Sequence, residues 1–294
     1  MSQRPLAALF SAVICGSTLM FAQQATVQGV VTDQSNAVVP GVKITVTNVA
    51  TGVAQSVETN AQGFYSLPFL LPGTYRVEAV AKGFAPAIRE NLKLDVDQTA
   101  RLDIALRLGA VAETVEVSAA AALIDSQTSV VGQVIDNKRI VELPLNGRNY
   151  LELARLTTGV APDFGSRTSS KGSFSAVGQR GYQTNVLLDG VDNNSRASGG
   201  QLGFEAQGVT PSIDAVAEFK VVTNNNSAEY GFRMGGTVIV QTKSGSNEFH
   251  GSAYEFMRNE KLDAANFFAV GQPKPPYKRN QFGEIGRASC RERV

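Results

Sequence analysis

The chain has 294 residues, a formal net charge of +1 and 43% hydrophobic residues. This length is enough for more than one globular domain. The near-neutral charge gives no electrostatic reason to expect binding to nucleic acid or to an acidic membrane surface. The two cysteines, Cys15 and Cys290, lie near opposite ends and indicate neither a disulfide framework nor a metal site. The 28 glycines, with frequent Val, Thr and Asn, favour a protein rich in strands and turns.

The first residues have the layout of a secretory signal peptide. Arg4 supplies positive charge, residues 6–21 are apolar and almost uncharged, and small residues follow. Cleavage is expected after Ala22, with Ala25 as the second choice. A membrane anchor is the less favoured alternative, because the apolar run is shorter than the roughly 20 residues that a spanning helix needs. The sequence thus predicts a signal peptide over residues 1–22 and export of the mature chain.

Residues 26–109 predict one small all-β domain. Apolar and polar residues alternate in several short segments, and turn sequences such as Pro72-Gly73 separate them. Short strands with regular turn signals are typical of a β-sandwich. The expected strands lie at 27–32, 42–47, 64–67 and 75–79, with a last strand between 92 and 106.

The same stretch resembles the carboxypeptidase regulatory-like domain, an immunoglobulin-like β-sandwich. The name does not imply catalysis, because a zinc peptidase needs His and carboxylate ligands, and His250, the only histidine, lies outside the domain. The resemblance implies a rigid spacer or docking unit in the periplasm. The matching segments are 29–33, 40–42, 60–65, 71–75 and 82–84.

Residues 110–129 form a linker rich in Ala, Ser and Val that contains a short alternating run. Val115 and Val117 with polar neighbours suit a strand that can detach. The run resembles the TonB box, the segment through which TonB-dependent outer-membrane receptors couple to their partner, and the implied mode is addition of a strand to a partner's sheet. An ordinary last strand or linker is the alternative. The run comprises Glu113, Thr114, Val115, Glu116, Val117, Ser118 and Ala119.

Residues 130–245 contain an ordered set of strand and glycine signals. An Arg-Gly turn leads into the apolar strand 186–188, which ends at Asp-Gly, a pair that favours a tight turn. Further strands are expected at 217–222 and 237–242, with Ala217, Phe219 and Val221 on one face. This order and spacing resemble the plug domain of TonB-dependent receptors. The residues of the motif are Arg180, Gly181, Asp189, Gly190, Tyr230, Gly231, Gly235 and Gly236.

Two roles stay open for Arg180, an ion pair with acidic groups of a barrel wall or a solvated side chain. Close packing and positive φ explain the glycines at 231, 235 and 236. No strand, glycine loop and helix surround them as a phosphate site would require. The acidic and amide residues 192–194 lack the spacing of a calcium loop, so a plain turn is favoured.

A short helix is expected after residue 148. Asn149 can cap it, with Glu152 as the partner in a capping box, and Gly159 and Pro162 mark its end. The buried side is expected to include Leu151, Leu153, Ala154 and Leu156.

Residues 224–226 are three asparagines, at a place where most plug domains carry Gly-Pro. This departure resembles the Oar-like receptors, which carry the regulatory-like domain at the amino terminus.

Residues 246–285 resemble the first strands of the receptor barrel, in which residues that face lipid and lumen alternate. His250 is expected to be a surface or lumen residue. Residues 286–294 are dense in Arg and look like a non-native tail. Because such a barrel needs about 22 strands, we expect the sequence to be the amino-terminal part of a longer receptor.

The expected fold is therefore mainly β: an immunoglobulin-like β-sandwich, a mixed α+β plug domain and the first strands of an incomplete transmembrane β-barrel. The resemblance implies active uptake of a scarce substrate across the outer membrane, with the first domain in the periplasm and TonB as partner. No catalytic set, metal site or cofactor is expected, and the transported ligand is not readable. A secreted adhesion or carbohydrate-binding protein is the alternative, and a secreted peptidase is a third that would need metal ligands.

Overall fold

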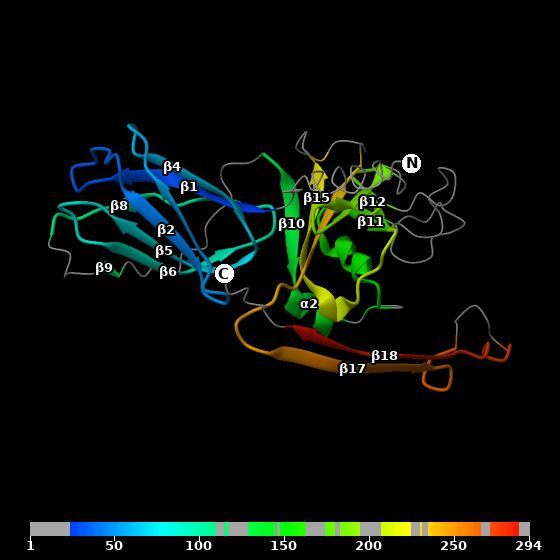
Figure 1. Ribbon diagram of the computed structural model, residues 1–294. Helices are drawn as coiled ribbons and strands as arrows, with labels where there is room; N and C mark the ends of the chain where they lie inside the picture. The colour runs from blue at the N-terminus through cyan, green and yellow to red at the C-terminus, as the bar shows by residue number, and fades with distance from the viewer. Residues whose placement is uncertain are drawn as a thin grey trace, which may run out of the picture.

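The computed structural model describes residues 24–109, 115–116, 129–143, 145, 148–162, 174–179, 183–194, 207–224, 230, 235–265 and 271–287. Figure 1 shows strands through most of these segments and only short helices, so the fold is mainly β. A group of strands from the first third of the chain lies beside a sheet with helices, and a long hairpin lies below that sheet. The expected signal peptide lies outside the described residues.

The first unit contains β1 (Ala25–Thr32), β2 (Lys43–Asn48), β3 (Ala54–Glu58), β4 (Phe64–Leu70), β5 (Gly73–Val80), β6 (Ala87–Leu94), β7 (Thr99–Arg101), β8 (Ile104–Ala105) and β9 (Val115–Glu116). One sheet has the order β4-β1-β7, and β8 also pairs with β1. The other sheet has the order β3-β2-β5-β6-β9.

The two sheets share one apolar core. Alternation along the strands turns Val27, Ile44 and Val77 inward, and each exposes 1% or less of its surface. The core joins residues of both sheets, which is consistent with the expected immunoglobulin-like sandwich. This first unit is called the sandwich below.

Two details of the sandwich differ from the sequence prediction, and one predicted turn connects its two sheets. Strand β3 was not expected, and Pro72-Gly73 connects β4 to β5, which lie in different sheets, so this turn joins the two sheets. The single strand expected between 92 and 106 is divided among the end of β6, β7 and β8. Residues 95–98 cross from one sheet to the other, with Asp97 at a φ of 54°, and Val96 among them packs against the second unit.

The second unit is built on β10 (Val131–Asp136), β13 (Asn185–Leu188), β14 (Val191–Asp192), β15 (Val216–Asn224) and β16 (Thr237–Thr242). Their order is β10-β15-β16-β13-β14, and this sheet is called the mixed sheet. Only the β13–β16 pair within it is parallel. The shorter elements are α2 (Asn137–Glu142), η3 (Tyr150–Leu156), η5 (Ile213–Ala215), β11 (Val160–Pro162) and β12 (Phe174–Ala176).

The short helices cover one face of the mixed sheet. Ile140 of α2 and Tyr150 and Leu151 of η3 are buried with Phe219 and Val221 of β15. The rings of Tyr150 and Phe219 meet edge to face, with centroids 5.4 Å apart. This core fixes the position of β15.

The η3 helix begins as expected, but its first turn is held differently. The Asn149 side chain accepts a hydrogen bond from the Leu151 N–H at 3.0 Å. The Glu152 carboxylate, expected as the capping-box partner, forms an ion pair with Arg155 at 2.9 Å along the helix. Leu156, expected to be buried, exposes 52% of its surface because the tighter 3₁₀ turn places it on the outer side.

Strand β15 departs from the predicted alternation. Phe219 and Val221 face the helices as expected, but every residue from Glu218 to Thr223 is buried. The second face is covered because residues 95–98 of the sandwich pack on it.

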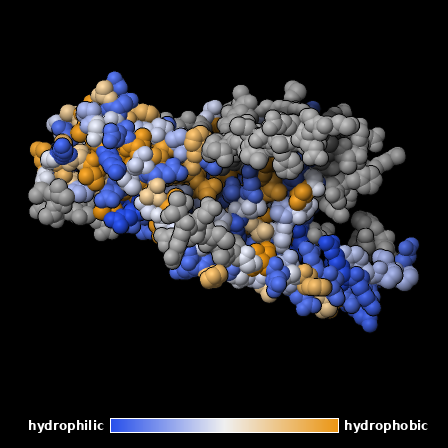
Figure 2. Space-filling view, in the orientation of Figure 1, coloured by the Kyte–Doolittle hydropathy of each residue, from blue (hydrophilic) through white to orange (hydrophobic). Residues whose placement is uncertain are grey.

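The last two strands form a separate hairpin. Strand β17 (His250–Asn259) pairs along its full length with β18 (Lys278–Arg287). Strand β18 includes Gly286 and Arg287, the first two residues of the stretch expected to be a non-native tail. Residues 288–294 lie outside the described part. Figure 2 shows a largely hydrophilic surface over the hairpin in this view. Among the described residues, no helix has the length and apolar character needed to cross a membrane.

Candidate functional site

The Asp189-Gly190 turn has the predicted geometry. Both residues have positive φ, 47° and 86°, as the tight turn between β13 and β14 requires. The Asp189 carboxylate also accepts hydrogen bonds from the Thr242 N–H and hydroxyl, each at 2.8 Å. The turn is therefore tied to the end of β16 and fixes the edge of the mixed sheet.

Gly235 and Gly236 are needed for close approach. Their φ values are not in the positive region, contrary to the sequence prediction. A Cβ on Gly235 would lie 2.5 Å from the Gln183 carbonyl oxygen, and one on Gly236 would lie 2.7 Å from the Cβ of Ala176. Gly236 also accepts a hydrogen bond from the Asn185 N–H at 2.9 Å, where β13 and β16 begin to pair. The glycines therefore let the parallel pair form.

The oxygen-rich residues after the turn hold neighbouring backbone. The Asn194 side chain accepts from the Val186 N–H at 3.0 Å, and the Asn193 side chain donates to and accepts from Val209, both at 2.8 Å. These contacts give the two asparagines a structural role. Within the described segments, no group of three or more His, Cys, Asp or Glu is arranged to hold a metal ion.

The structure places the described motif residues at three positions, of which the start of the β13–β16 pair, with Gly235 and Gly236, is one. Tyr230 is buried on the face of the mixed sheet that contacts the sandwich, whereas Asp189 and Gly190 lie at the β13–β14 turn. Arg180, Gly181 and Gly231 fall outside the described residues.

The centre of the expected coupling segment is a strand of the sandwich. Val115 and Glu116 form β9, which pairs in parallel with Ala87 and Ile88 of β6. The other five residues of the run, Glu113, Thr114, Val117, Ser118 and Ala119, fall outside the described part of the chain.

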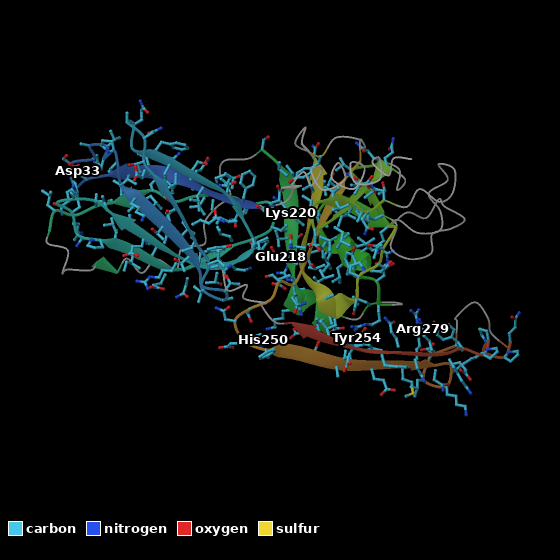
Figure 3. The ribbon with its side chains drawn as sticks, in the orientation of Figure 1. Asp33, Glu218, Lys220, His250, Tyr254 and Arg279 are labelled. Atoms are coloured by element: carbon cyan, nitrogen blue, oxygen red, sulfur yellow. The ribbon has the colours of Figure 1, made fainter. Side chains whose placement is uncertain are left out.

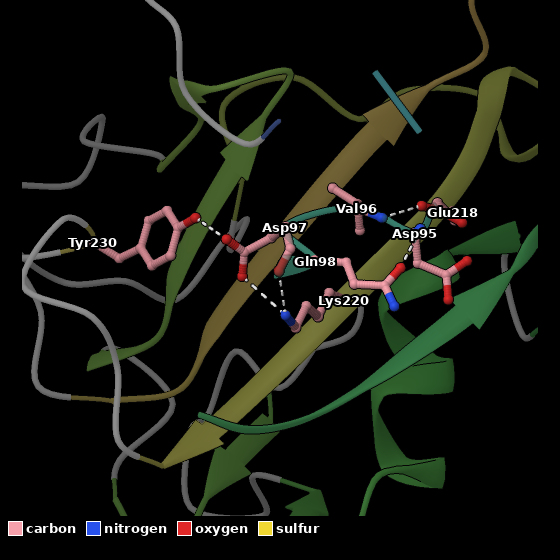
Figure 4. A network of polar contacts seen from close by, with 7 residues as sticks. All are labelled: Asp95, Val96, Asp97, Gln98, Glu218, Lys220 and Tyr230. Atoms are coloured by element: carbon pink, nitrogen blue, oxygen red, sulfur yellow. Dashed lines mark hydrogen bonds and ion pairs between the residues drawn. The ribbon is translucent and has the colours of Figure 1, made fainter. Parts of the chain in front are cut away.

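A loop of the sandwich is embedded in the outer face of the mixed sheet (Figure 4). This loop, residues 95–98, connects β6 to β7. Val96 is fully buried and packs with Val222, Tyr230 and Ile239. We call these contacts, together with the polar ones described next, the interdomain clamp.

An ion pair lies next to Val96. The Lys220 ammonium donates to the Asp97 carboxylate at 3.0 Å and to its carbonyl oxygen at 2.7 Å. The Tyr230 hydroxyl donates to the other carboxylate oxygen of Asp97. The Lys220 side chain exposes only 9% of its surface and the Asp97 side chain 20%. Each charge has therefore lost most of its contact with water, and the opposite charge compensates for that loss.

Glu218 occupies the other side of Val96. Its carboxylate accepts a hydrogen bond from the Val96 N–H. Burial, followed by the nearby charge of Asp95, raises the pKa of Glu218 to about 7, and the Val96 hydrogen bond and Lys93 oppose this rise. Asp136 adds to the rise. Figure 3 shows Glu218 and Lys220 where the sandwich meets the mixed sheet.

The sequence prediction did not single out Glu218, Lys220 or Asp97. A weak signal exists in the sequence: two charged residues interrupt an apolar strand at 218 and 220, on the face opposite Phe219. Such residues usually mark a solvated face, so the alternation alone could not identify a second partner.

The hairpin contacts the second unit through one face of β17. The Arg148 guanidinium lies 3.4 Å from the ring centre of Phe256 and 3.3 Å from the Asp214 carboxylate. Ser212 and Tyr254 share a hydrogen bond of 3.2 Å between their hydroxyls. A groove of about 720 Å³ adjoins this contact and is lined in part by Arg148 and Phe256. His250, near the other end of β17 (Figure 3), is half exposed, which agrees with the expected surface position.

We expect Gly235→Ala to destabilise the protein by about 1–3 kcal/mol, because the new methyl group would meet a backbone carbonyl. The control is Gly286→Ala, where nothing lies within 4 Å of the added atom. Urea unfolding of the full chain measures both variants. Equal stability of the two variants would contradict the close-approach role.

We expect Lys220→Met to cost about 3 kcal/mol, because the Asp97 carboxylate would stay buried without its cation. The control is Arg76→Met, which removes an ion pair with Glu90 whose side chains are 47% and 38% exposed and should cost at most about 1 kcal/mol. The free energy of unfolding is again the measurement. A loss at Lys220 no larger than that at Arg76 would show that the ion pair is not needed.

The raised pKa of Glu218 predicts weaker docking at higher pH. The docked form holds the proton more tightly than a free carboxyl of pKa 4.5, so the contribution is fully present below pH 4.5 and is lost as the pH rises through about 7. Glu218→Gln keeps the acceptor for Val96 and removes the titration. The difference in melting temperature, variant minus wild type, should therefore increase between pH 5 and pH 8. A difference that does not change with pH would refute this linkage.

Two segments of the chain match known protein families. Residues 26–107 match the carboxypeptidase regulatory-like domain family, and residues 241–285 match the outer membrane beta barrel domain family.

One curated relative is the TonB-dependent transporter Oar of Myxococcus xanthus. It is 33% identical over 244 residues, which cover 80% of this chain and 22% of the relative. The chain thus spans about a fifth of the length of that protein.

Solved structures share only part of the chain. The Bacillus anthracis TIE protein is 19% identical, with a TM-score of 0.26 over 29% of this chain and 17% of its own. A putative carbohydrate binding protein from Bacteroides uniformis is 20% identical, with a TM-score of 0.25 over 28% of this chain and 40% of its own.

The chain therefore carries a carboxypeptidase regulatory-like domain and outer-membrane β-barrel sequence, and over four-fifths of its length it is related to a TonB-dependent transporter.

Proposed function

We propose that this chain is part of a TonB-dependent outer-membrane transporter for active uptake of a scarce substrate. The single observation that carries the proposal is the 33% identity to the TonB-dependent transporter Oar across 80% of the chain. The match of residues 241–285 to an outer-membrane barrel family supports the same location. The alternative of a secreted adhesion protein is not favoured by this relative, and the proposed activity is transport, not catalysis.

Residues 130–245 are proposed to be the plug that gates the barrel lumen. Support comes from the compact mixed sheet, whose core is closed on one face by α2 and η3. The motif residues fix its geometry, because Asp189 ties the β13–β14 turn to β16 and Gly235 allows the parallel pair. A sheet whose strands and turns are held together in this way is suited to move as one body when the lumen opens.

Residues 246–285 are proposed to begin the barrel. In β17, Tyr254 and Phe256 contact Ser212 and Arg148 of the second unit and are partly buried, while the alternate residues on the other face, Ala253, Glu255 and Met257, are exposed. Gly283 of β18 leaves room for the Tyr254 ring, since a Cβ there would lie 2.6 Å from the hydroxyl. This arrangement suits a barrel wall with one face toward a plug.

The sandwich is proposed to lie in the periplasm, and residues 113–119 to bind TonB by strand addition. Pairing of Val115 and Glu116 with β6 supports this mode, because the segment takes an extended form and joins a sheet edge. Strand addition uses backbone groups more than side chains. The proposal therefore makes a prediction that depends on the backbone alone.

We expect Val115→Pro to abolish capture of the full chain by the immobilised periplasmic domain of TonB, because proline lacks the N–H that strand pairing uses. Val115→Ala is the matched control and should bind within about twofold of wild type, since its backbone is unchanged. Deletion of residues 113–119 should equal the proline variant. Undiminished capture of either the proline or the deletion variant would show that coupling uses another segment.

A further inference from the structure

The open edge of β6 is protected along most of its length but not at its start. From Arg89 to Lys93 the edge carries charged side chains, and Asn91 sits at a φ of 58°, beside a break in register with β5. Charges and bulges of this kind keep other strands from pairing with an edge. Ala87 and Ile88 have neither protection.

Strand β9 occupies this unprotected start. Ala87 pairs with Val115 and Ile88 pairs with Glu116, in parallel. Within the described part of the chain, the pairing covers the two residues that precede the charged part of β6. The edge thus has a short strand-accepting site, and the part of the chain bound there is the middle of the proposed coupling segment.

The last sandwich residues before the linker lie close to the start of β6. Phe84 and Leu108 form a bridge, and the Ala85 N–H donates to the Arg107 carbonyl at 2.9 Å. Only a few residues separate Leu108 from Val115, so the segment can reach β6 at a small cost in loop entropy. The described β6–β9 ladder has two residue pairs, and a short linker joins β9 to the rest of the sandwich, so the ladder can form and break readily.

The other end of β6 is fixed on the mixed sheet. Residues 95–98 follow β6 directly and form the interdomain clamp with Lys220 and Val222. The strand-accepting site therefore has a set position relative to the mixed sheet.

We propose that the start of β6 is a docking site for the chain's own coupling segment, which holds residues 115–116 until a partner strand competes for them. This inference rests on the proposed function. A segment that is free for only a fraction of the time binds its partner with an affinity reduced by that fraction. The regulatory-like domain would thereby set how available the segment is to TonB.

A reversible cross-link tests the proposal. In a chain with Cys15→Ser and Cys290→Ser, the pair Ala87→Cys and Val115→Cys joins residues that are partners across the ladder. Oxidation should lock the segment on β6 and weaken capture by the immobilised periplasmic domain of TonB by at least roughly tenfold. Reduction should restore capture to the wild-type level.

The matched control is the pair Thr47→Cys and Ala54→Cys, which are partners in the β2–β3 ladder away from the segment. This cross-link should leave capture unchanged in both redox states. If the control pair forms a disulfide and the 87–115 pair does not, the segment is not held on β6. If the 87–115 cross-link forms but capture is unchanged, TonB adds to the outer edge of β9. Pairing of residues 115–116 with β6 then does not compete with TonB binding, and the proposal is wrong.

The outcomes also separate this inference from the function on which it rests. Failure of the reduced protein and of wild type to bind TonB would reject the coupling proposal itself. Binding by the reduced protein, with no loss on oxidation, would reject only the docking site on β6.

Discussion

Burial of β15 on both faces is the constraint on which the rest of the structure depends. One face carries Phe219 and Val221 against the short helices, and the other carries Glu218 and Lys220 against the sandwich. A central strand covered on both sides is normally apolar throughout. Here the second face keeps two ionisable groups, so it is satisfied only when residues 95–98 of the sandwich supply their partners.

The polar part of the interdomain clamp is better suited to specify an orientation than to add stability. A buried ion pair gains little over a well-packed apolar contact, because both ions lose their hydration. Lys220 reaches both the carboxylate and the carbonyl of Asp97, and Tyr230 takes the remaining carboxylate oxygen. These directional bonds fit only one placement of the loop, whereas Val96 alone would tolerate several.

What could be predicted from the sequence was set by residues close together in the chain. The Asp189-Gly190 turn and the Asn149 cap were correct because their own side chains and φ values determine them. The division of residues 92–106 into separate strands was not predictable, because β7 and β8 pair with β1 near the start of the chain, whereas β6 pairs with β5 in the other sheet. Gly235 was identified as structural, but its reason, a clash with Gln183, also depends on a distant contact. Glu218 and Lys220 were missed for the same reason.

Strand β6 combines these local and distant effects. Its start lies beside the exit of the chain from the sandwich, which favours pairing with the nearby β9. Its end leads into a loop that is buried only because β15 offers Lys220 and an apolar patch. A sandwich with β6 at its edge therefore joins two parts of the chain that the sequence presents as separate, the proposed coupling segment and the proposed plug. Burial raises the pKa of Glu218 to about 7, so the interdomain clamp at one end of β6 depends on pH. The ladder at the other end of β6 uses backbone groups and does not depend on pH. The two contacts can thus be weakened independently of each other.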